Sequence, residues 1–409
     1  MSATPPGDDR ASSGWWSSAT RDRHVRRAFL AVALLVVLLY PQIQPIIGTG
    51  PRLTTAVPVL LFVVLALGLN VVVGFAGLLD LGYAAFFAIG AYSVAFFTSS
   101  TSPIPYFVEH PANFFAAMAA STVIAALFGV LLGAPTLRLR GDYLAIVTLG
   151  FGEIVPLVVR NTPEWTKGTQ GMNPIGVPEL PQPLVEALGK VQFTLGPVEV
   201  TDVNLRFGLD TGPWYYLVLA IVALSVVVTA RLRTSRIGRA WMAIREDEVA
   251  AASMGINPVT TKLFAFSMGA SFSGFAGSIF ASYLQVIAPE QFRFDVSIFV
   301  LSMIILGGMG NIWGVIIGGA LLGLADRMLP DIVGGVARNL GQQLDVKSLK
   351  EVDVSQFRSL AFGLVLVIMM RVRPEGLFPS ARRKMELHAA DESDDEAAQQ
   401  RATLYEAQR

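Results

Sequence analysis

The feature that most constrains this chain is a succession of apolar segments, each near the length that crosses a lipid bilayer as a helix. About 20 helical residues span roughly 30 Å of hydrocarbon. The segments between the two polar ends of the chain lie near residues 28–47, 53–73, 83–99, 114–135, 142–160, 213–230, 262–284, 296–307, 312–329 and 357–371. With 53% hydrophobic and 15% charged residues, the chain is too apolar for an ordinary soluble protein of its length. The sequence therefore predicts an all-α polytopic membrane protein with about ten transmembrane helices.

The segment at 296–307 is shorter than the others and runs directly into three glycines. These are Gly307, Gly308 and Gly310. A helix that stops at membrane depth is tolerated where neighbouring helices or water satisfy its free backbone groups. We therefore expect a broken helix here, inside the protein.

The two ends of the chain differ in composition from the segments between them. Residues 1–27 and 380–409 are rich in small, polar and charged residues, which cannot bury enough apolar surface to fold. We expect two disordered tails around a membrane domain at residues 28–379. A cleaved signal peptide is disfavoured, because a long polar stretch precedes the first apolar run and no small-residue cleavage site follows it.

Basic residues in the connections predict the orientation, because cytoplasmic loops carry an excess of Lys and Arg. Four basic clusters fall on one side of the membrane if the chain crosses ten times. They are Arg21, Arg23, Arg26 and Arg27; Arg138 and Arg140; Arg231, Arg233, Arg236, Arg239 and Arg245; and Arg371, Arg373, Arg382, Arg383 and Lys384. We therefore expect both termini in the cytoplasm, residues 160–212 as an extracytoplasmic loop and residues 231–258 as a cytoplasmic segment.

This topology also permits an inverted repeat. The four segments before residues 213–230 and the four after them would cross the membrane in opposite senses. The glycine-rich runs at 74–82 and 307–314 are similar in kind. Inverted repeats remain an expectation that rests on topology and not on a demonstrated sequence repeat.

Several classes of chemistry lack the residues that they need. The chain has no cysteine, and its three histidines, His24, His110 and His388, lie far apart and outside the apolar segments. We therefore expect no catalytic residues and no metal site. The net charge is zero, with 31 Lys and Arg against 31 Asp and Glu, which gives no argument for nucleic acid. No Gly-x-x-x-x-Gly-Lys-Ser/Thr phosphate loop occurs, so the chain does not bind ATP by that mechanism.

Residues 231–258 carry the signals of a short helical segment. Thr234 or Ser235 suits a helix start, and Gly255 and Pro258 suit a helix stop. Helical spacing predicts an apolar knob beside Arg239, Arg245 and Glu248. Its apolar residues are Trp241, Met242 and Ile244, with Val249, Ala252 and Met254 further on. Such a knob indicates either a protein partner or a helix that lies on the lipid surface.

The order of residues in this segment and elsewhere resembles one family. Glu248, Ala250, Ala251 and Gly255 are similar to the Glu-Ala-Ala, three residues, Gly loop by which bacterial importer permeases engage their ATPase, with one extra residue after Glu248. Residues 68–83, 137–154 and 306–314, in that order, resemble branched-chain amino acid permeases of the LivM type. Residues 167–174 lack the paired glycines that many members have there, and both tails are longer than usual.

The resemblance implies a type II importer-like permease subunit of an ATP-binding cassette system in the bacterial cytoplasmic membrane. Implied partners are two cytoplasmic ATPases, a second related permease and an extracytoplasmic substrate-binding protein. ATP and Mg²⁺ would bind to the ATPases, and this chain would hold no cofactor. The implied cargo is a branched-chain or other hydrophobic amino acid. Sister members carry urea or short amides, and an ion-coupled secondary transporter is the alternative from another class. The implied coupling residues are Arg239, Trp241, Ile244, Arg245, Glu248, Ala250, Ala251 and Gly255.

Polar residues and breaks inside the apolar segments are candidates for the translocation path, because charge is costly there. The candidates are Asn70, Gly77, Asp80, Glu153, Gly307, Gly308 and Gly310. Glu153 either meets the amino group of a zwitterion or hydrogen-bonds to a neighbouring helix. Asp80 either lines the path or caps the helix that follows it. Asn70 either lines the path or hydrogen-bonds between helices. A binding protein would deliver the cargo, so we expect a path with few polar contacts.

Overall fold

The computed structural model describes residues 37–42, 52–136, 142–179, 193–195, 198–200, 207–208, 211–343, 363–364, 367–369, 371–373 and 376–378. Both predicted tails, and most of the predicted spans at 28–47 and 357–371, lie outside the described residues. The described part is almost entirely helical. Its two named strands form a short antiparallel pair, β1 (Phe193–Leu195) and β2 (Val198–Val200).

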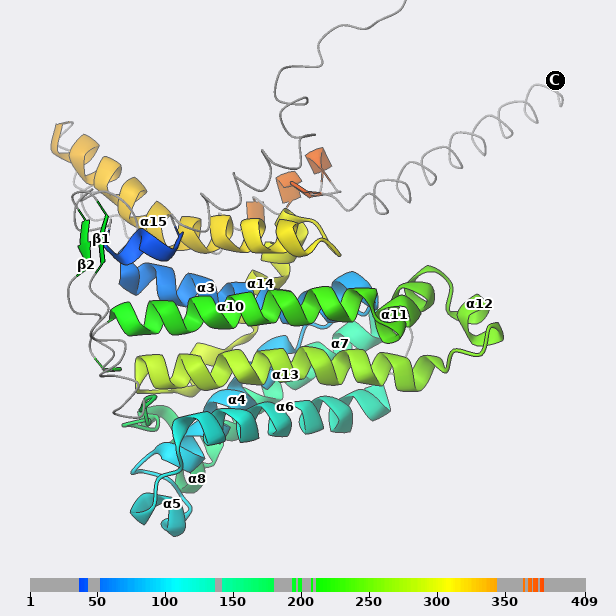
Figure 1. Cartoon of the computed structure of the whole chain (residues 1–409), viewed down its shortest axis with the longest axis horizontal. Helices are drawn as coiled ribbons and strands as arrows, with labels where there is room; N and C mark the ends of the chain where they lie inside the picture. Colours follow the sequence, from blue (N-terminus) through cyan, green and yellow to red (C-terminus); the bar gives the residue numbers. More distant parts are fainter. Residues whose placement is uncertain are drawn as a thin grey trace, which may run out of the picture.

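Two long helices form the centre of the bundle (Figure 1). The first is α3 (Leu53–Leu69), which continues as the π-helix η1 (Asn70–Phe75), and the second is α13 (Pro258–Leu284). Both are mostly buried, which explains why their apolar residues run around the whole helix and form no stripe.

The other helices pack around this pair. Helices α4 (Tyr83–Thr98) and α6 (Phe114–Thr136) lie against α13, whereas α10 (Thr211–Thr234) and α15 (Ile312–Gln343) lie against α3. Helix α14 (Phe294–Gly307) lies between α15 and α3, and α7 (Asp142–Asn161) packs on α4. Large parts of α6, α7 and α10 are exposed, so these three form the outer wall.

Five of the described helical segments are long and apolar enough to cross a membrane. They are Leu53–Phe75, Phe114–Thr136, Tyr143–Asn161, Thr211–Thr234 and Pro258–Leu284. Helix α4 is apolar but shorter. Helix α14 has only 14 residues and ends at Gly307, as the sequence predicts. A multi-helical fold with candidate membrane spans is therefore observed, and the count of ten spans and the inverted repeat stay predictions.

The two ends of the bundle differ in structure (Figure 1). At one end project α11 (Arg236–Glu246) and α12 (Glu248–Ser253). The opposite end carries the short elements α5 (Pro105–Glu109), α8 (Pro163–Thr166), η2 (Gly168–Gln170) and η3 (Pro289–Phe292). There Met172 bridges to Ile287 through backbone hydrogen bonds, and Arg160 pairs with Glu290 at 2.9 Å. The described part of the predicted extracytoplasmic loop is thus tied to the end that lies away from α11 and α12.

Small residues let the central helices touch backbone to backbone. A Cβ atom added at Gly90 of α4 would overlap the backbone of Gly274 on α13. Gly277 of α13 meets the backbone of Phe87 on α4 in the same way, and a Cβ at Gly274 would overlap Ala125 of α6. Such close approach is typical of helix pairs in membranes, where van der Waals packing drives association.

Gly90→Ala is expected to lower the melting temperature of the purified chain in detergent by several degrees. The added methyl group has no space, so the two helices must separate, and overpacking of this kind costs about 1–3 kcal/mol. Gly150→Ala on α7 is the matched control, since no atom lies within 4 Å of a Cβ built there. Equal melting temperatures for Gly90→Ala and the unchanged chain would contradict the packing described above.

Candidate functional site

The predicted cytoplasmic segment folds as two helices and not as one. Ser235 caps α11, where its hydroxyl accepts a hydrogen bond from the Gly238 N–H at 3.1 Å. Asp247 then interrupts the helix, and its carboxylate accepts hydrogen bonds from the backbone of Val249 and Ala250. Because Asp247 satisfies the free N–H groups of a new helix start, α12 begins there. The expected Ser235 start is confirmed, and the expectation of a single helix is wrong.

The end of the segment follows the sequence signals. Gly255 adopts a left-handed backbone with φ of 86°, which a residue with a side chain rarely adopts. Asn257 accepts a hydrogen bond from the Thr260 N–H, and Pro258 is the first residue of α13. The segment therefore returns into the bundle through a sharply defined turn.

The structure divides the predicted apolar knob into a buried part and an exposed part. Trp241 and Ile244 are buried, because they attach α11 to the bundle. The Trp241 indole donates to the Thr261 carbonyl at 2.8 Å and stacks on Phe264. The most exposed large apolar side chains of the segment are Val249 at 74% and Met254 at 84%, on and just after α12.

The remaining coupling candidates take different positions. Glu248 pairs with Lys262 of α13 at 2.6 Å, which ties α12 to the bundle. Arg239 is exposed and donates back to the Thr234 carbonyl at 2.7 Å. Ala250 is exposed and Ala251 is buried. The exposed apolar surface of α12 and its end therefore includes Val249, Ala250 and Met254.

Arg245 points inward to a contact between two helix breaks. Its guanidinium donates to the carbonyl of Gly74 in η1, 171 residues away in sequence. Its aliphatic carbons lie against Gly77, where an added Cβ would come within 2.7 Å of Arg245 Cγ. A Cβ at Gly310 would lie 3.7 Å from the same guanidinium. The sequence predicts a partner contact for Arg245 and does not reveal this internal one.

Asn70 joins the same two breaks. Its side-chain oxygen accepts a hydrogen bond from the Gly310 N–H at 2.9 Å, across 240 residues of sequence. Among the residues that the structure describes, the buried Nδ2 of Asn70 has no hydrogen-bond partner. We call the set formed by Asn70, Gly74, Gly77, Gly310 and Arg245 the break junction. The glycine runs that the sequence singles out thus meet in space.

Left-handed glycines shape the break junction. Gly77, Gly308 and Gly310 have φ values of 70°, 108° and 79°, respectively. Gly307 has no room for a side chain, since a Cβ there would overlap the backbone of Gly314. The helix α14 therefore ends where the sequence predicts, and the chain turns back into α15 within a few residues.

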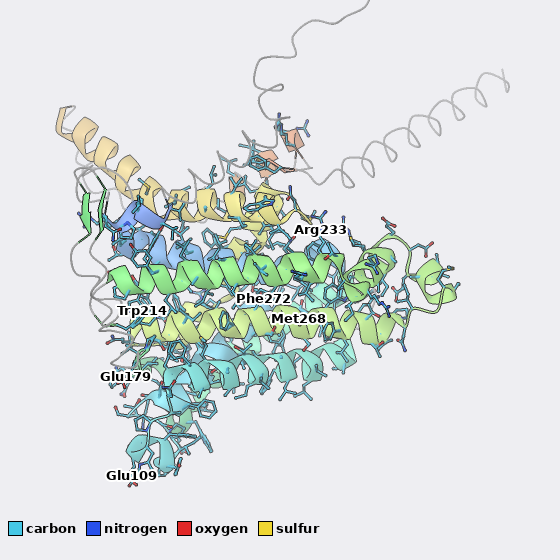
Figure 2. All side chains as sticks on the ribbon, in the orientation of Figure 1. Glu109, Glu179, Trp214, Arg233, Met268 and Phe272 are labelled. Atoms are coloured by element: carbon cyan, nitrogen blue, oxygen red, sulfur yellow. The ribbon has the colours of Figure 1, made fainter. Side chains whose placement is uncertain are left out.

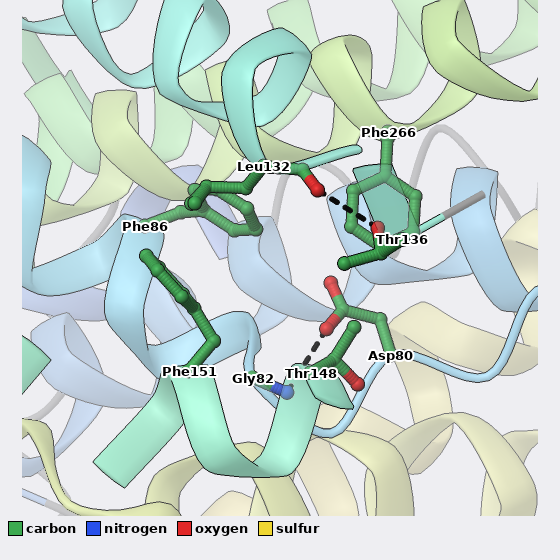
Figure 3. Close-up of a pocket in the computed structure, with 8 residues that line it drawn as sticks. All are labelled: Asp80, Gly82, Phe86, Leu132, Thr136, Thr148, Phe151 and Phe266. Carbon is green, nitrogen blue, oxygen red and sulfur yellow. Dashed lines mark hydrogen bonds between the residues drawn. The ribbon is translucent and has the colours of Figure 1, made fainter. Parts of the chain in front are cut away.

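Asp80 lies beside the break junction in a small cavity between α4, α6, α7 and α13 (Figure 3). Its side chain is 1% exposed, and its carboxylate accepts a hydrogen bond from the Gly82 N–H at 2.9 Å. The cavity has room for about 20 Å³, close to one water molecule. The cap of α4 is Gly82 and not Asp80, so Asp80 organises the turn just before the helix. An amino acid does not fit this cavity in the conformation observed.

Comparison with known proteins assigns most of the chain to one protein family. The family model described as "Branched-chain amino acid transport system / permease component" matches residues 52–370. That range covers more than half of the chain and includes the break junction and the α11–α12 segment. The chain belongs to this family of branched-chain amino acid permeases.

Individual relatives agree with the family. A protein of Escherichia coli named high-affinity branched-chain amino acid transport system permease protein LivM is 37% identical over 369 residues, which are 89% of this chain and 77% of the relative. The LivM protein of Salmonella typhimurium is 35% identical over 379 residues, 91% of this chain and 80% of the relative. The LivH permease protein of Escherichia coli is 34% identical over 115 residues, 28% of this chain and 36% of the relative. No solved structure matches.

In this branched-chain amino acid permease, Glu153 stands apart from the break junction. It is exposed on α7, whereas the preceding residue, Gly152, is buried against Gly82. The structure therefore brings together Asn70, Gly77 and Gly310, with Asp80 nearby, and leaves Glu153 on the outer wall.

A second cavity lies in the outer wall of the permease, between α6, α10 and α13. It has room for about 200 Å³ and an almost wholly apolar lining, which includes Met268 and Phe272 of α13, Leu224 of α10 and Thr122 of α6. Figure 2 shows Met268 and Phe272 along α13, beneath α10. The Thr122 hydroxyl already donates to the Met118 carbonyl. This cavity offers apolar contact and few free polar groups.

Proposed function

We propose that this chain is the membrane-spanning permease subunit of an ATP-binding cassette importer for branched-chain amino acids. The exposed docking surface on α12 carries the proposal, together with family membership. The relatives reported above are named as branched-chain amino acid permeases, which favours that cargo over urea or short amides. Since the sequence has no phosphate loop, the energy of transport comes from a separate ATPase.

The α11–α12 segment is suited to receive that ATPase. Val249 and Met254 expose apolar area at the end of the bundle. Exposed apolar area in water is typical of a surface that a partner protein covers. Ser235, Asp247 and Asn257 fix the helix starts, and Trp241 and Glu248 anchor the two helices to α13. A rigid, anchored element transmits a push from a bound partner into the bundle.

The proposed orientation places the α11–α12 end in the cytoplasm, with both chain termini on that side of a bacterial cytoplasmic membrane. The arginines at Arg231, Arg233, Arg236 and Arg239 support it, because the positive-inside rule favours the cytoplasm for such a cluster. The opposite end, with α5, α8 and η3, would then face the extracytoplasmic binding protein. A second related permease and two ATPases complete the proposed assembly.

The proposed path closes at the break junction and opens when the ATPases change conformation. A hydrogen bond from Gly310 to Asn70 joins the two breaks, and a hydrogen bond from Arg245 to Gly74 joins α11 to the first of them. Such bonds are easily exchanged for contacts to water or cargo. The unpartnered Nδ2 of buried Asn70 offers a donor to a passing carboxylate, and the Asp80 carboxylate offers an acceptor. Neither group binds tightly alone, which suits transport of a cargo that another protein captures.

The decisive experiment is reconstitution. We expect the chain to copurify with an ATPase and a second permease, and proteoliposomes with the binding protein to take up leucine only when ATP is enclosed. Leucine should stimulate the ATP hydrolysis. Uptake by this chain alone, driven by an ion gradient, would overturn the proposal in favour of a secondary transporter. Uptake of urea that leucine does not inhibit would overturn the assignment of branched-chain amino acids as the cargo.

A further inference from the structure

One side of α7 is exposed along its whole length. Six exposed residues lie on this side, at steps of three or four residues except for the neighbours Glu153 and Ile154: Tyr143, Ile146, Gly150, Glu153, Ile154 and Leu157. The opposite side packs on the bundle through buried residues such as Thr148 and Gly152. We call the first six residues the α7 outer face. It is a continuous stripe that no described element of this chain covers.

The α7 outer face differs from the rest of the outer wall by its charge. On α6, every exposed side chain from Phe114 to Pro135 is apolar, and the same is true of α10 as far as Ala230. Those surfaces suit lipid tails. Glu153 places a carboxylate near the middle of the 20-residue helix α7. Ionisable side chains at that depth face protein or water, because hydrocarbon leaves them unsolvated.

The glycine beside Glu153 provides space for a partner. Gly150 lies one turn before Glu153 on the same side, and a Cβ built there meets no atom within 4 Å. A small residue at the exposed surface of a membrane helix lets another helix approach its backbone closely. A polar side chain next to such a point hydrogen-bonds to the approaching helix. Glu153 and Gly150 together therefore fit a second protein helix better than lipid.

The described part of the first apolar segment does not cover this stripe. The Tyr215 hydroxyl donates to the Val37 carbonyl at 2.7 Å, and the Tyr40 ring lies against the Tyr215 ring. Residues 37–42 are thus held at the start of α10, which packs on α3, α11 and α15. Helix α7 packs instead on α4, α6, α14 and short elements at one end of the bundle.

We propose that the α7 outer face is the surface on which the second, related permease subunit packs, with Glu153 paired to a hydrogen-bond donor of that subunit. The proposal rests on the proposed function, which requires two permease subunits, and adds the contact between them. Gly150 is the point of closest approach. The apolar residues Ile146, Ile154 and Leu157 on either side exclude lipid and water from the Glu153 pair.

The test uses the absence of cysteine from the chain, which allows single-cysteine labels. Ile154→Cys on α7 and Leu127→Cys on α6 are each labelled with bimane, in nanodiscs that contain doxyl-phosphatidylcholine. Leu127 is the matched control, because it is exposed on a wholly apolar wall. Both labels should be quenched in the chain alone. In the assembled importer, quenching should be lost at Ile154→Cys and kept at Leu127→Cys.

A second variant tests the role of the carboxylate. Glu153→Leu keeps the size and helix preference but removes the hydrogen bond, so the second permease recovered with the tagged chain should fall several-fold. Leu224→Ala on α10 should leave that recovery unchanged. Persistent quenching at Ile154→Cys in an importer that performs ATP-driven leucine uptake would overturn the interface and leave the proposed function standing. Failure of the unchanged chain to recover a second permease or to support uptake would overturn both.

Discussion

Arg245→Ala is expected to abolish ATP-driven leucine uptake while the ATPase stays bound. The substitution removes the hydrogen bond to the Gly74 carbonyl and the packing on Gly77, so that α11 loses its contact with the break junction. A hydrogen bond from a charged group is worth about 1.5–3 kcal/mol, enough to shift an opening equilibrium more than tenfold. Uptake in proteoliposomes and copurification of the ATPase measure the two effects separately.

The matched control is Arg236→Ala, on the same helix and exposed. It removes an equal charge without touching the break junction, and uptake should stay near that of the unchanged importer. Arg245→Lys keeps the charge with a different shape and should restore part of the uptake. The Arg245→Ala importer should still hydrolyse ATP, but leucine should no longer stimulate that hydrolysis. An Arg245→Ala importer that transports normally would show that α11 does not act through the junction.

Val249→Asp combined with Met254→Asp is expected to remove the ATPase from the purified complex altogether. These two side chains are the large exposed apolar groups of α12 and its end, at 74% and 84% exposure. An aspartate at each position replaces apolar contact area by charges that a docked protein must desolvate. Because neither side chain packs inside the chain, the melting temperature of the isolated permease should not change. Affinity purification through a tag on this chain gives the readout.

The same change at the other end of the bundle provides the control. Tyr106→Asp combined with Val108→Asp alters two exposed residues of α5, at 65% and 42% exposure. This variant should keep the ATPase, although contacts to the extracytoplasmic binding protein can weaken. Retention of the ATPase by the α12 variant would place the docking surface elsewhere. Loss of the ATPase from both variants would indicate a general effect of added charge.

Local signals in the sequence predict much of the α11–α12 segment. Ser235 caps a helix because its hydroxyl reaches an N–H three residues on, and Gly255 ends one because it tolerates a positive φ. Both depend on neighbours within a few residues. Asp247 carries the same type of signal, an aspartate ahead of an alanine-rich run, and it marks the start of α12, which was not among the predicted helix starts.

Burial and long-range contacts are less accessible from one sequence. Trp241 and Ile244 form an apolar face of α11, and periodicity alone does not say whether a partner or the bundle covers it. The contacts of Asn70 with Gly310 and of Arg245 with Gly74 join residues 240 and 171 positions apart. The packing of the helices determines which residues Asn70 and Arg245 contact, and that packing is a property of the whole fold.

The acidic candidates Asp80 and Glu153 also combine features that the sequence predicts with features that depend on packing. The sequence leaves open whether Asp80 lines the path or caps the next helix, and the structure finds it two residues before the cap, where its carboxylate accepts a hydrogen bond from Gly82. The cavity that surrounds Asp80 draws on α6, α7 and α13, which no local pattern reveals. The depth of Glu153 in the span is evident from the sequence, whereas its outward position on α7 depends on which side packs against α4.

The backbone contact between Gly90 and Gly274 limits how this permease can alternate between its two open states. Flexible side chains between helices allow them to slide, but two backbones in direct contact interlock and travel as one rigid body. Helices α4 and α13 are therefore expected to keep their relative position throughout the transport cycle. The hinge must lie elsewhere, and the π-helical turn at Asn70–Phe75 is the place where the hydrogen-bond ladder of a central helix is already irregular.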